Sequence, residues 1–295
     1  VAAGSEALEF GALGPDEIRA AGMGAFWAVA QGSHNPPRLI TLAYEPPAPA
    51  RGELHLGLVG KALTFDAGGI SIKPADGLEE MKSDMGGGAA VLAAIGAIAE
   101  LGLPVRILGV VPACENMPGG HAYRPGDIVT AASGKTIEVV NTDAEGRLIL
   151  ADALWYAREQ GVTHLVDLAT LTGTITVAMG DFYAGLFGND PAWVAEVQAA
   201  ADASGDHAWT LPLHRSYRRF LDSTFADLKN CPDKRRGSSI IAAIFLQEFA
   251  GDGPWAHVDI AGTAYLDRAR DYFPGIGATG YGVRLLTELA RRLGA

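Results

Sequence analysis

The sequence contains few cysteines and no long apolar run. Its two cysteines, Cys114 and Cys231, are far apart and form no CxxC pair, so the sequence indicates neither a disulfide framework nor a thiolate zinc site. Both are expected to be reduced, as in the cytosol. No stretch of about 18 consecutive apolar residues is present, as a membrane-spanning helix would need, and the first residues lack the pattern of a signal peptide. We therefore expect a cytoplasmic protein with no membrane partner.

Positive charge is scarce too. There are 23 lysines and arginines against 34 acidic residues, which gives a formal net charge of −11. Binding to nucleic acid or to an anionic membrane depends on clustered basic residues, so neither partner is expected. Apolar residues, in contrast, make up 48% of the chain and charged residues only 19%. This composition is typical of a well-packed globular protein.

The N-terminal residues carry little pattern. Residues 1–15 are rich in glycine and alanine, and we interpret them as a tail or linker remnant. No internal repeat or linker is evident after Arg51, so residues 16–295 are predicted to form one domain. Because the chain begins with valine instead of methionine, we expect it to be a piece of a longer protein.

Short apolar runs alternate with polar loops and helical patterns along the chain. The clearest strands are residues 54–59, 136–140 and 162–168. This alternation predicts an α/β fold: a single three-layer domain with a mixed, mostly parallel sheet and helices on both faces. In such sheets ligands collect at the carboxyl ends of the strands. Further strands are expected at 38–44, 105–111 and 256–260, and helices at 15–30, 89–101, 191–203, 239–249, 282–293 and from His214.

The octapeptide NTDAEGRL, residues 141–148, is the most unusual stretch. Asp143, Glu145 and Arg147 alternate there just before an apolar helical pattern. Acids are ordinary at a helix N-terminus, so an N-cap role for Asp143 is the alternative. A second polar cluster upstream, VGKALTFDAGGISIKP followed by MKSDMGG, favours a functional site. Its members are Lys61, Asp66, Lys73 and Asp84.

Four acids and one lysine from these two stretches suit a metal site. The acids are Asp66, Asp84, Asp143 and Glu145. Their charge is enough for two divalent ions, which could acidify a water and polarise a carbonyl or phosphoryl group. Lys61 could ligate only as a neutral amine, which nearby cations favour by lowering its pKa; a structural salt bridge is the alternative. Since no histidine lies near these acids, ligand hardness favours Mg²⁺ or Mn²⁺ over Zn²⁺.

Lys73 and Arg147 are further cations close to these acids in sequence. Either could stabilise the negative charge that develops on an oxygen during hydrolysis. Lys73 shares a glycine-rich loop with Lys61, so it could reach the same centre, although a solvated loop lysine is the alternative. His257 and Asp259 share one face of a strand, but without further ligands they do not indicate a metal site.

Five motifs follow one another along the chain: VGKALTFDAGGISIKP, MKSDMGG, ENMPGGHAYRPGDIV, NTDAEGRLILADAL and DLATLTG. Together they resemble the catalytic domain of the leucine aminopeptidase family of dinuclear metallopeptidases, often called the cytosol aminopeptidases. The resemblance extends from about Gly22 to the C-terminus, and NTDAEGRL is highly specific. Members usually carry an N-terminal domain, which we do not expect in this chain because only about fifty residues precede the first metal loop, and they typically form hexamers.

The resemblance implies roles for individual positions. The metal ligands would be Lys61, Asp66, Asp84, Asp143 and Glu145. Asp66 and Glu145 would bridge two ions, which would be zinc or manganese, with magnesium or cobalt also accommodated. Lys73 would contact the tetrahedral intermediate, and Arg147 would hold a bicarbonate that acts as general base. The pocket for the first side chain would be lined by Met81, Thr170 and Gly173.

The implied protein is a metal-dependent aminopeptidase, a cytoplasmic homohexamer that acts on peptides or dipeptides with an apolar first residue such as leucine. A hydroxide bridging the ions would attack the N-terminal peptide bond, and Lys73 would stabilise the oxyanion. Two alternatives stay open. A dinuclear phosphoester hydrolase uses the same pair of cations, and a non-catalytic relative would keep only the fold.

Overall fold

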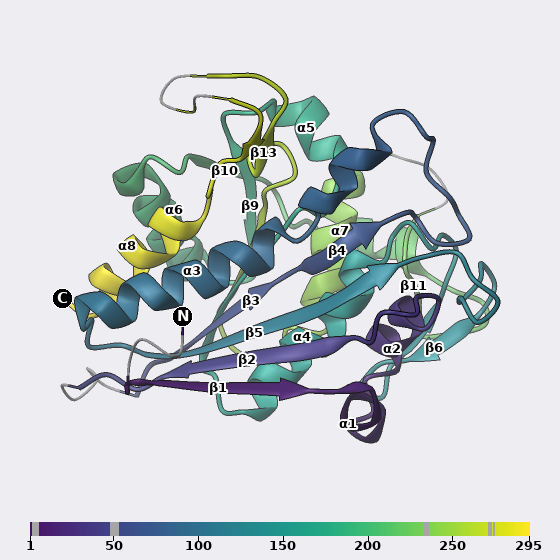
Figure 1. Ribbon diagram of the computed structural model, residues 1–295, viewed down its shortest axis with the longest axis horizontal. Coiled ribbons are helices and arrows are strands. Elements are labelled where there is room, and N and C mark those ends of the chain that lie inside the picture. The colour runs from purple at the N-terminus through teal and green to yellow at the C-terminus, as the bar shows by residue number, and fades with distance from the viewer. Residues whose placement is uncertain (2–5, 48–52, 233–235, 271–272, 274) are drawn as a thin grey trace.

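The computed structural model describes residues 1, 6–47, 53–232, 236–270, 273 and 275–295. A large mixed sheet has helices on both of its faces (Figure 1). The strand order is β1-β2-β5-β3-β8-β12-β9-β10, and β4 pairs with β5. The strands are β1 (Leu8–Leu13), β2 (Arg38–Tyr44), β3 (His55–Gly60), β4 (Ala62–Asp66), β5 (Arg106–Asn116), β8 (His164–Ala169), β9 (Ala184–Gly188), β10 (Ala208–Thr210) and β12 (Trp255–Asp259).

The centre of this sheet is parallel. β3 runs parallel to both β5 and β8, and β12 runs parallel to β8. On either side of this centre, β2 is antiparallel to β5 and β9 is antiparallel to β12. Every residue of β3 is buried, because a strand in the middle of a sheet that is covered on both faces has no solvent side. Because the central strands are parallel, their carboxyl ends meet at one edge of the sheet.

The helices divide into two layers. Buried side chains of α2, α4 and α7 pack in one core, and those of α3, α6 and α8 pack in another on the opposite face. The predicted three-layer α/β fold is thereby confirmed. The helices are α1 (Pro15–Ala20), α2 (Gly24–Ala30), α3 (Gly86–Leu101), α4 (Gly146–Glu159), α5 (Gly173–Met179), α6 (Pro191–Ser204), α7 (Ser238–Gln247) and α8 (Val283–Leu293), with 3-10 helices η2 (Leu78–Ser83) and η3 (Arg215–Leu221).

In the part of the chain that the structure describes, one helical stretch is apolar enough to cross a membrane when only length and composition are considered. This stretch, Leu78–Leu101, has a mean hydropathy of 1.4. It contains α3, whose side chains of Val91, Ala94 and Ile95 are fully buried against the sheet. A central helix of a folded domain has the same composition.

Three sequence expectations need correction. Residues 8–13 of the expected tail form β1, which pairs with β2 along its whole length, while residues 2–5 lie outside the described residues. The helix expected at 15–30 is divided into α1 and α2, because the chain turns at Gly22, where φ is 71°. The strand expected at 136–140 is β7 (Thr136–Glu138), which pairs with β6 (Ile128–Thr130) and β11 (Leu228–Lys229) in a separate small sheet.

A buried carboxyl group of α4 joins three parts of the fold. Asp152 is 1% exposed; its Oδ2 accepts from Phe26 N at 2.8 Å and its Oδ1 from Ala132 N at 2.7 Å. Asp152 thus holds the first turn of α2 and the β6–β7 turn against α4.

Replacing Asp152 by alanine is expected to lower the free energy of unfolding by about 2 to 6 kcal/mol, because two buried N–H groups would lose their acceptors at about 1 to 3 kcal/mol each. Urea unfolding of the wild type and Asp152→Ala measures this difference. A change below about 0.5 kcal/mol, the usual size for a surface substitution, would contradict the role given to this carboxyl group.

Candidate metal centre

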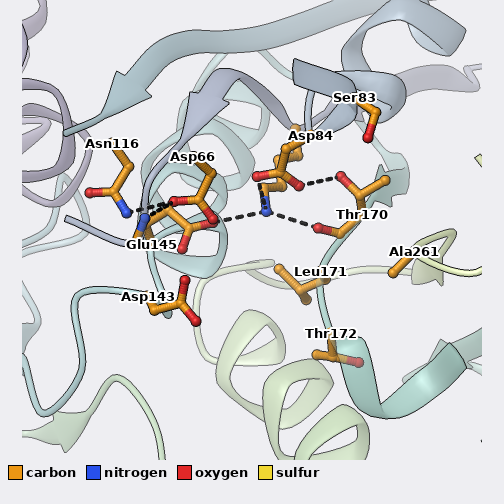
Figure 2. Close-up of polar contacts among 12 residues, drawn as sticks. Asp66, Ser83, Asp84, Asn116, Asp143, Glu145, Thr170, Leu171, Thr172 and Ala261 are labelled. Atoms are coloured by element: carbon orange, nitrogen blue, oxygen red, sulfur yellow. Dashed lines mark hydrogen bonds and ion pairs between the residues drawn. The ribbon is translucent and has the colours of Figure 1, made fainter. Parts of the chain in front are cut away.

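Four acidic side chains gather at the carboxyl edge of the sheet (Figure 2). Asp66 ends β4, and Asp84 follows η2. Asp143 lies in the loop before α4, and Glu145 is the N-cap residue of that helix. Oxygen atoms of Asp66, Asp143 and Glu145 all lie within 4.8 Å of one another. The simple N-cap interpretation of Asp143 is wrong, since α4 begins three residues later, at Gly146, and its N-cap residue is Glu145.

Lys61 lies among these acids directly after β3. Its Nζ is 2.8 Å from Asp84 Oδ2 and 2.9 Å from Glu145 Oε1, and it donates to the carbonyl oxygen of Thr170 at 2.8 Å. The side chain crosses the first turn of α4 so closely that a Cβ at Gly146 would lie 2.7 Å from Lys61 Nζ. The glycine of NTDAEGRL therefore makes room for the lysine. The salt bridges proposed above as the alternative to a ligand role for Lys61 are thus present.

Crowding changes the pKa values of these groups. Burial raises the pKa of Asp84 to about 7 and also raises that of Glu145, to which the charge of Asp66 adds. Burial opposes charge on Lys61, but attraction by Asp84 and Glu145 outweighs it and raises the pKa of the amine. A neutral Lys61 would therefore require nearby cations that offset these carboxylates.

The donor set fits divalent cations. Glu145 Oε2 is buried and has no hydrogen-bond partner in the described part of the chain. Asp84 Oδ2 is also buried and contacts Lys61 only as an ion pair. A buried carboxylate oxygen without a donor is costly, and a cation between Asp66, Asp143 and Glu145 would remove that cost and their mutual repulsion.

Lys73 also joins this cluster. Its Nζ lies 2.6 Å from Asp66 Oδ2 and donates to Asp143 Oδ1. The side chain is 21% exposed, so it reaches both the acids and the solvent side of the site. The surrounding loop is fixed by Thr142, whose hydroxyl donates to Gly68 O at 2.6 Å and accepts from Ser71 N at 2.8 Å. The alternative of a solvated loop lysine is wrong.

Asn116 belongs to the site and was not identified from the sequence. It ends β5, beside β4, and its Nδ2 donates to Asp66 Oδ1 at 2.8 Å and to Thr142 O at 3.0 Å. The side chain therefore orients Asp66 and leaves Oδ2 of that residue facing Lys73. Its position at the carboxyl end of a central strand was the available signal.

The remaining predicted site residues lie around the four acids or farther along the chain. Arg147 is buried in α4, where its Nη1 donates to Asn230 O at 2.8 Å and its Nε has no hydrogen-bond partner among the described residues. Burial lowers its pKa. Thr170 contacts Asp84 and Lys61, whereas Met81 lies half-buried in η2 and Gly173 is exposed at the start of α5. A shared side-chain pocket for Met81, Thr170 and Gly173 stays a prediction.

A cavity of about 310 Å³ lies away from these acids and contains none of the predicted site residues. Asp206 and Arg284, which line it, are paired at 2.6 Å. Asp206 also accepts from the backbone N–H groups of Gly282 and Leu285 at the start of α8, so its role is to hold that helix.

His257 contacts a buried acid of the neighbouring strand β8. Its Nδ1 lies 2.6 Å from Asp167 Oδ1, and Trp255 Nε1 donates to the other oxygen of Asp167 at 2.7 Å. All three side chains are fully buried. This contact uses one ring nitrogen of His257, and the absence of a metal site at His257 and Asp259 stays a prediction.

His257 is expected to make stability depend on pH. Burial alone would lower the pKa of His257, but the charge and hydrogen bond of Asp167 raise it. The folded state therefore holds the proton more tightly than the unfolded state, so this stabilisation is full below the unfolded pKa of about 6.5 and lost as pH rises through the folded pKa. In urea unfolding between about pH 5.5 and 8.5, wild type should lose more stability with rising pH than His257→Gln; equal slopes would contradict the assignment.

Comparisons with known proteins agree on one family. The model of the cytosol aminopeptidase family, catalytic domain, matches residues 1–287. A probable cytosol aminopeptidase of Solibacter usitatus is 56% identical over 293 residues, which are 98% of this chain and 60% of that protein. The probable cytosol aminopeptidase of Koribacter versatilis is 52% identical over 92% of this chain and 52% of that protein. That of Roseiflexus castenholzii is 51% identical over 95% of this chain and 57% of that protein. The chain thus spans between half and two thirds of the length of these relatives.

Proposed function

The chain belongs to the cytosol aminopeptidase family, and on that premise we propose that it is a metal-dependent aminopeptidase. It hydrolyses the N-terminal peptide bond of peptides or dipeptides. The observation that carries this proposal is the convergence of carboxylate oxygens from Asp66, Asp143 and Glu145 within 4.8 Å. The proposed ligands are Lys61, Asp66, Asp84, Asp143 and Glu145.

The ions are proposed to be two, zinc or manganese, with magnesium or cobalt as possible replacements. When bound, they acidify a water and polarise the scissile carbonyl group. Hard carboxylate donors without histidine suit Mn²⁺ and Mg²⁺, while the amine of Lys61 is a donor that Zn²⁺ also accepts. Asn116 supports the site by fixing the carboxylate of Asp66 through a bond of 2.8 Å.

The chain contributes two further groups to this reaction. Lys73 supplies a fixed positive charge for the oxygen that becomes negative during attack, which its partial exposure beside Asp66 and Asp143 allows. Arg147 offers a buried Nε–H that has no acceptor in the part of the chain that the structure describes. This donor suits a small anion such as bicarbonate, which would supply a general base when bound.

The preferred substrates are proposed to have an apolar first residue such as leucine. Met81, Thr170 and Gly173 are proposed to line the pocket for that side chain. In support, Met81 lies in η2 shortly before Asp84, Thr170 contacts Asp84, and Gly173 starts the helix after Thr170. The protein is proposed to act in the cytoplasm, which the name of its relatives, cytosol aminopeptidase, supports, and to form a homohexamer. Light scattering in solution tests the hexamer.

The proposed activity is tested with leucyl peptides and their N-acetylated counterparts in the presence of Mn²⁺. Release of leucine from the free peptides alone is expected, because an aminopeptidase requires an unblocked N-terminus. Hydrolysis of p-nitrophenyl phosphate without peptide cleavage would instead support a dinuclear phosphoesterase, which uses the same pair of cations.

A further inference from the structure

Asp259 is a fully buried carboxyl group that has no part in the proposed ligand set. It ends β12, and most of the hydrogen bonds to its two oxygens come from the turn after β8. Oδ1 accepts from Leu171 N at 3.1 Å, from Thr172 N at 3.4 Å and from Ala261 N at 3.3 Å. Oδ2 accepts from the hydroxyl of Thr172 at 2.6 Å. One side chain thus holds the backbone and the side chain of the turn that follows β8.

That turn leads directly to the acids. Thr170 donates its hydroxyl to Asp84 Oδ1 at 2.6 Å, and its carbonyl oxygen accepts from Lys61 Nζ at 2.8 Å (Figure 2). The two polar groups of one residue therefore orient two of the proposed ligands. Thr170 precedes by a single residue the backbone N–H of Leu171 that Asp259 holds.

The other side of the turn has a second attachment. The Thr172 hydroxyl lies 2.7 Å from Ser239 Oγ at the start of α7, and Ser239 Oγ lies 2.7 Å from the Thr174 hydroxyl in α5. Ser239 is itself 8% exposed. The position of the turn is thus set from inside the protein, by one carboxylate and a chain of hydroxyl groups.

We propose that Asp259 is a positioning residue for the metal centre, which fixes the turn Thr170–Thr172 so that Thr170 orients Asp84 and Lys61. This inference rests on the proposed function for its catalytic consequence. Residues that orient metal ligands typically change metal affinity or activity by about 10- to 100-fold when removed. Small displacements of reacting groups have effects of similar size.

The turn needs the hydrogen-bond acceptors of residue 259 and not its negative charge. In Asp259→Asn the amide oxygen can accept from the same three backbone N–H groups, and the amide nitrogen can donate to the Thr172 hydroxyl, which then donates to Ser239. In Asp259→Ala every one of these partners is lost. The two variants therefore separate positioning from charge.

Mn²⁺ titration by calorimetry, on chelator-treated protein, is the test. For Asp259→Ala we expect a dissociation constant for Mn²⁺ that is about 10- to 100-fold higher and a kcat that is about tenfold lower. Asp259→Asn should return both to within about threefold of the wild type, as expected when the hydrogen bonds remain. Asp152→Ala is the matched control, since it removes another buried carboxyl group that accepts from backbone N–H groups. It should lower the melting temperature and leave the affinity for Mn²⁺ unchanged.

Wild-type Mn²⁺ affinity in Asp259→Ala, or an equal loss in Asp259→Asn, would overturn the positioning role. If Asp259→Ala does not fold, Thr172→Val decides, because it removes only the hydroxyl between Asp259 and Ser239. A smaller loss of Mn²⁺ affinity is then expected, and no loss in Thr172→Val would count against the inference. A wild type that binds Mn²⁺ but cleaves no peptide would refute the proposed function and leave the affinity comparison valid.

Discussion

Glu145→Ala is expected to lower kcat/KM for a leucyl substrate by at least about 10³-fold. Ions that act as Lewis acids stabilise the transition state by several kcal/mol, and each 1.4 kcal/mol corresponds to about tenfold in rate. Glu145 contributes one oxygen to Lys61 at 2.9 Å and leaves the other without a partner among the described residues. Removing it takes away one of the three acids that converge within 4.8 Å.

The loss should be specific to the site. Burial raises the pKa of Glu145 and repulsion by Asp66 adds to this, whereas the ion pair with Lys61 at 2.9 Å opposes both, so removing the side chain relieves one cost and loses one ion pair. The variant should therefore melt at a temperature close to that of the metal-free wild type while binding fewer ions. Glu248→Ala is a control, because Glu248 is also paired with cations, Lys135 and Arg218 at 2.7 Å each, outside the acid cluster. Equal activity of Glu145→Ala and wild type would remove Glu145 from the ligand set.

Lys73→Ala is expected to lower kcat by about 10²- to 10³-fold, the usual effect of removing one donor to a developing oxyanion. KM should change much less, because the positive charge matters mainly when the oxygen becomes negative. Its Nζ is 2.6 Å from Asp66 Oδ2, so metal content must be measured in the same preparation.

The metal content decides between two roles for Lys73. Unchanged metal content with reduced kcat supports oxyanion stabilisation. Loss of both ions together with activity would make Lys73 a counter-ion that holds Asp66 and Asp143 in place. Lys73→Arg keeps the charge but not its position, and a partial recovery of kcat is expected.

The ligand candidates could be predicted because local sequence fixes their environment. Lys61 follows a fully buried strand, and Asp143 and Glu145 precede an apolar helical pattern. Strands that are parallel bring their carboxyl ends to one edge, so residues distant in the chain could be expected to meet.

The supporting residues could not be predicted in the same way. Asn116 contacts Asp66 across 50 positions, and Asp259 contacts Leu171 across 88. Such contacts depend on which strands are neighbours and in which register they pair. The local patterns of one sequence do not reveal either. The sequence pattern places Asp259 on one face of a strand with His257. It does not show that Asp259 accepts hydrogen bonds from the turn after β8.

Elements with weak local patterns were also missed. β1 contains glycine and exposed side chains, and its position is set by pairing with β2. β4 is short and lies in the stretch described above as the glycine-rich loop of Lys61 and Lys73, yet it pairs with β5 and delivers Asp66 to the site. The helix expected from His214 is the 3-10 helix η3. Tertiary contacts outweigh local propensity in each of these segments.

Metal-dependent hydrolysis of Leu-p-nitroanilide by the wild-type protein tests the central claim most directly. The protein is treated with a chelator and then supplied separately with Zn²⁺, Mn²⁺ or Mg²⁺, with Glu145→Ala measured in parallel. We predict that chelation abolishes hydrolysis, that at least one of these ions restores it, and that Glu145→Ala stays inactive with every ion. A folded, metal-loaded wild type that cleaves neither this substrate nor a panel of dipeptides would contradict the aminopeptidase assignment.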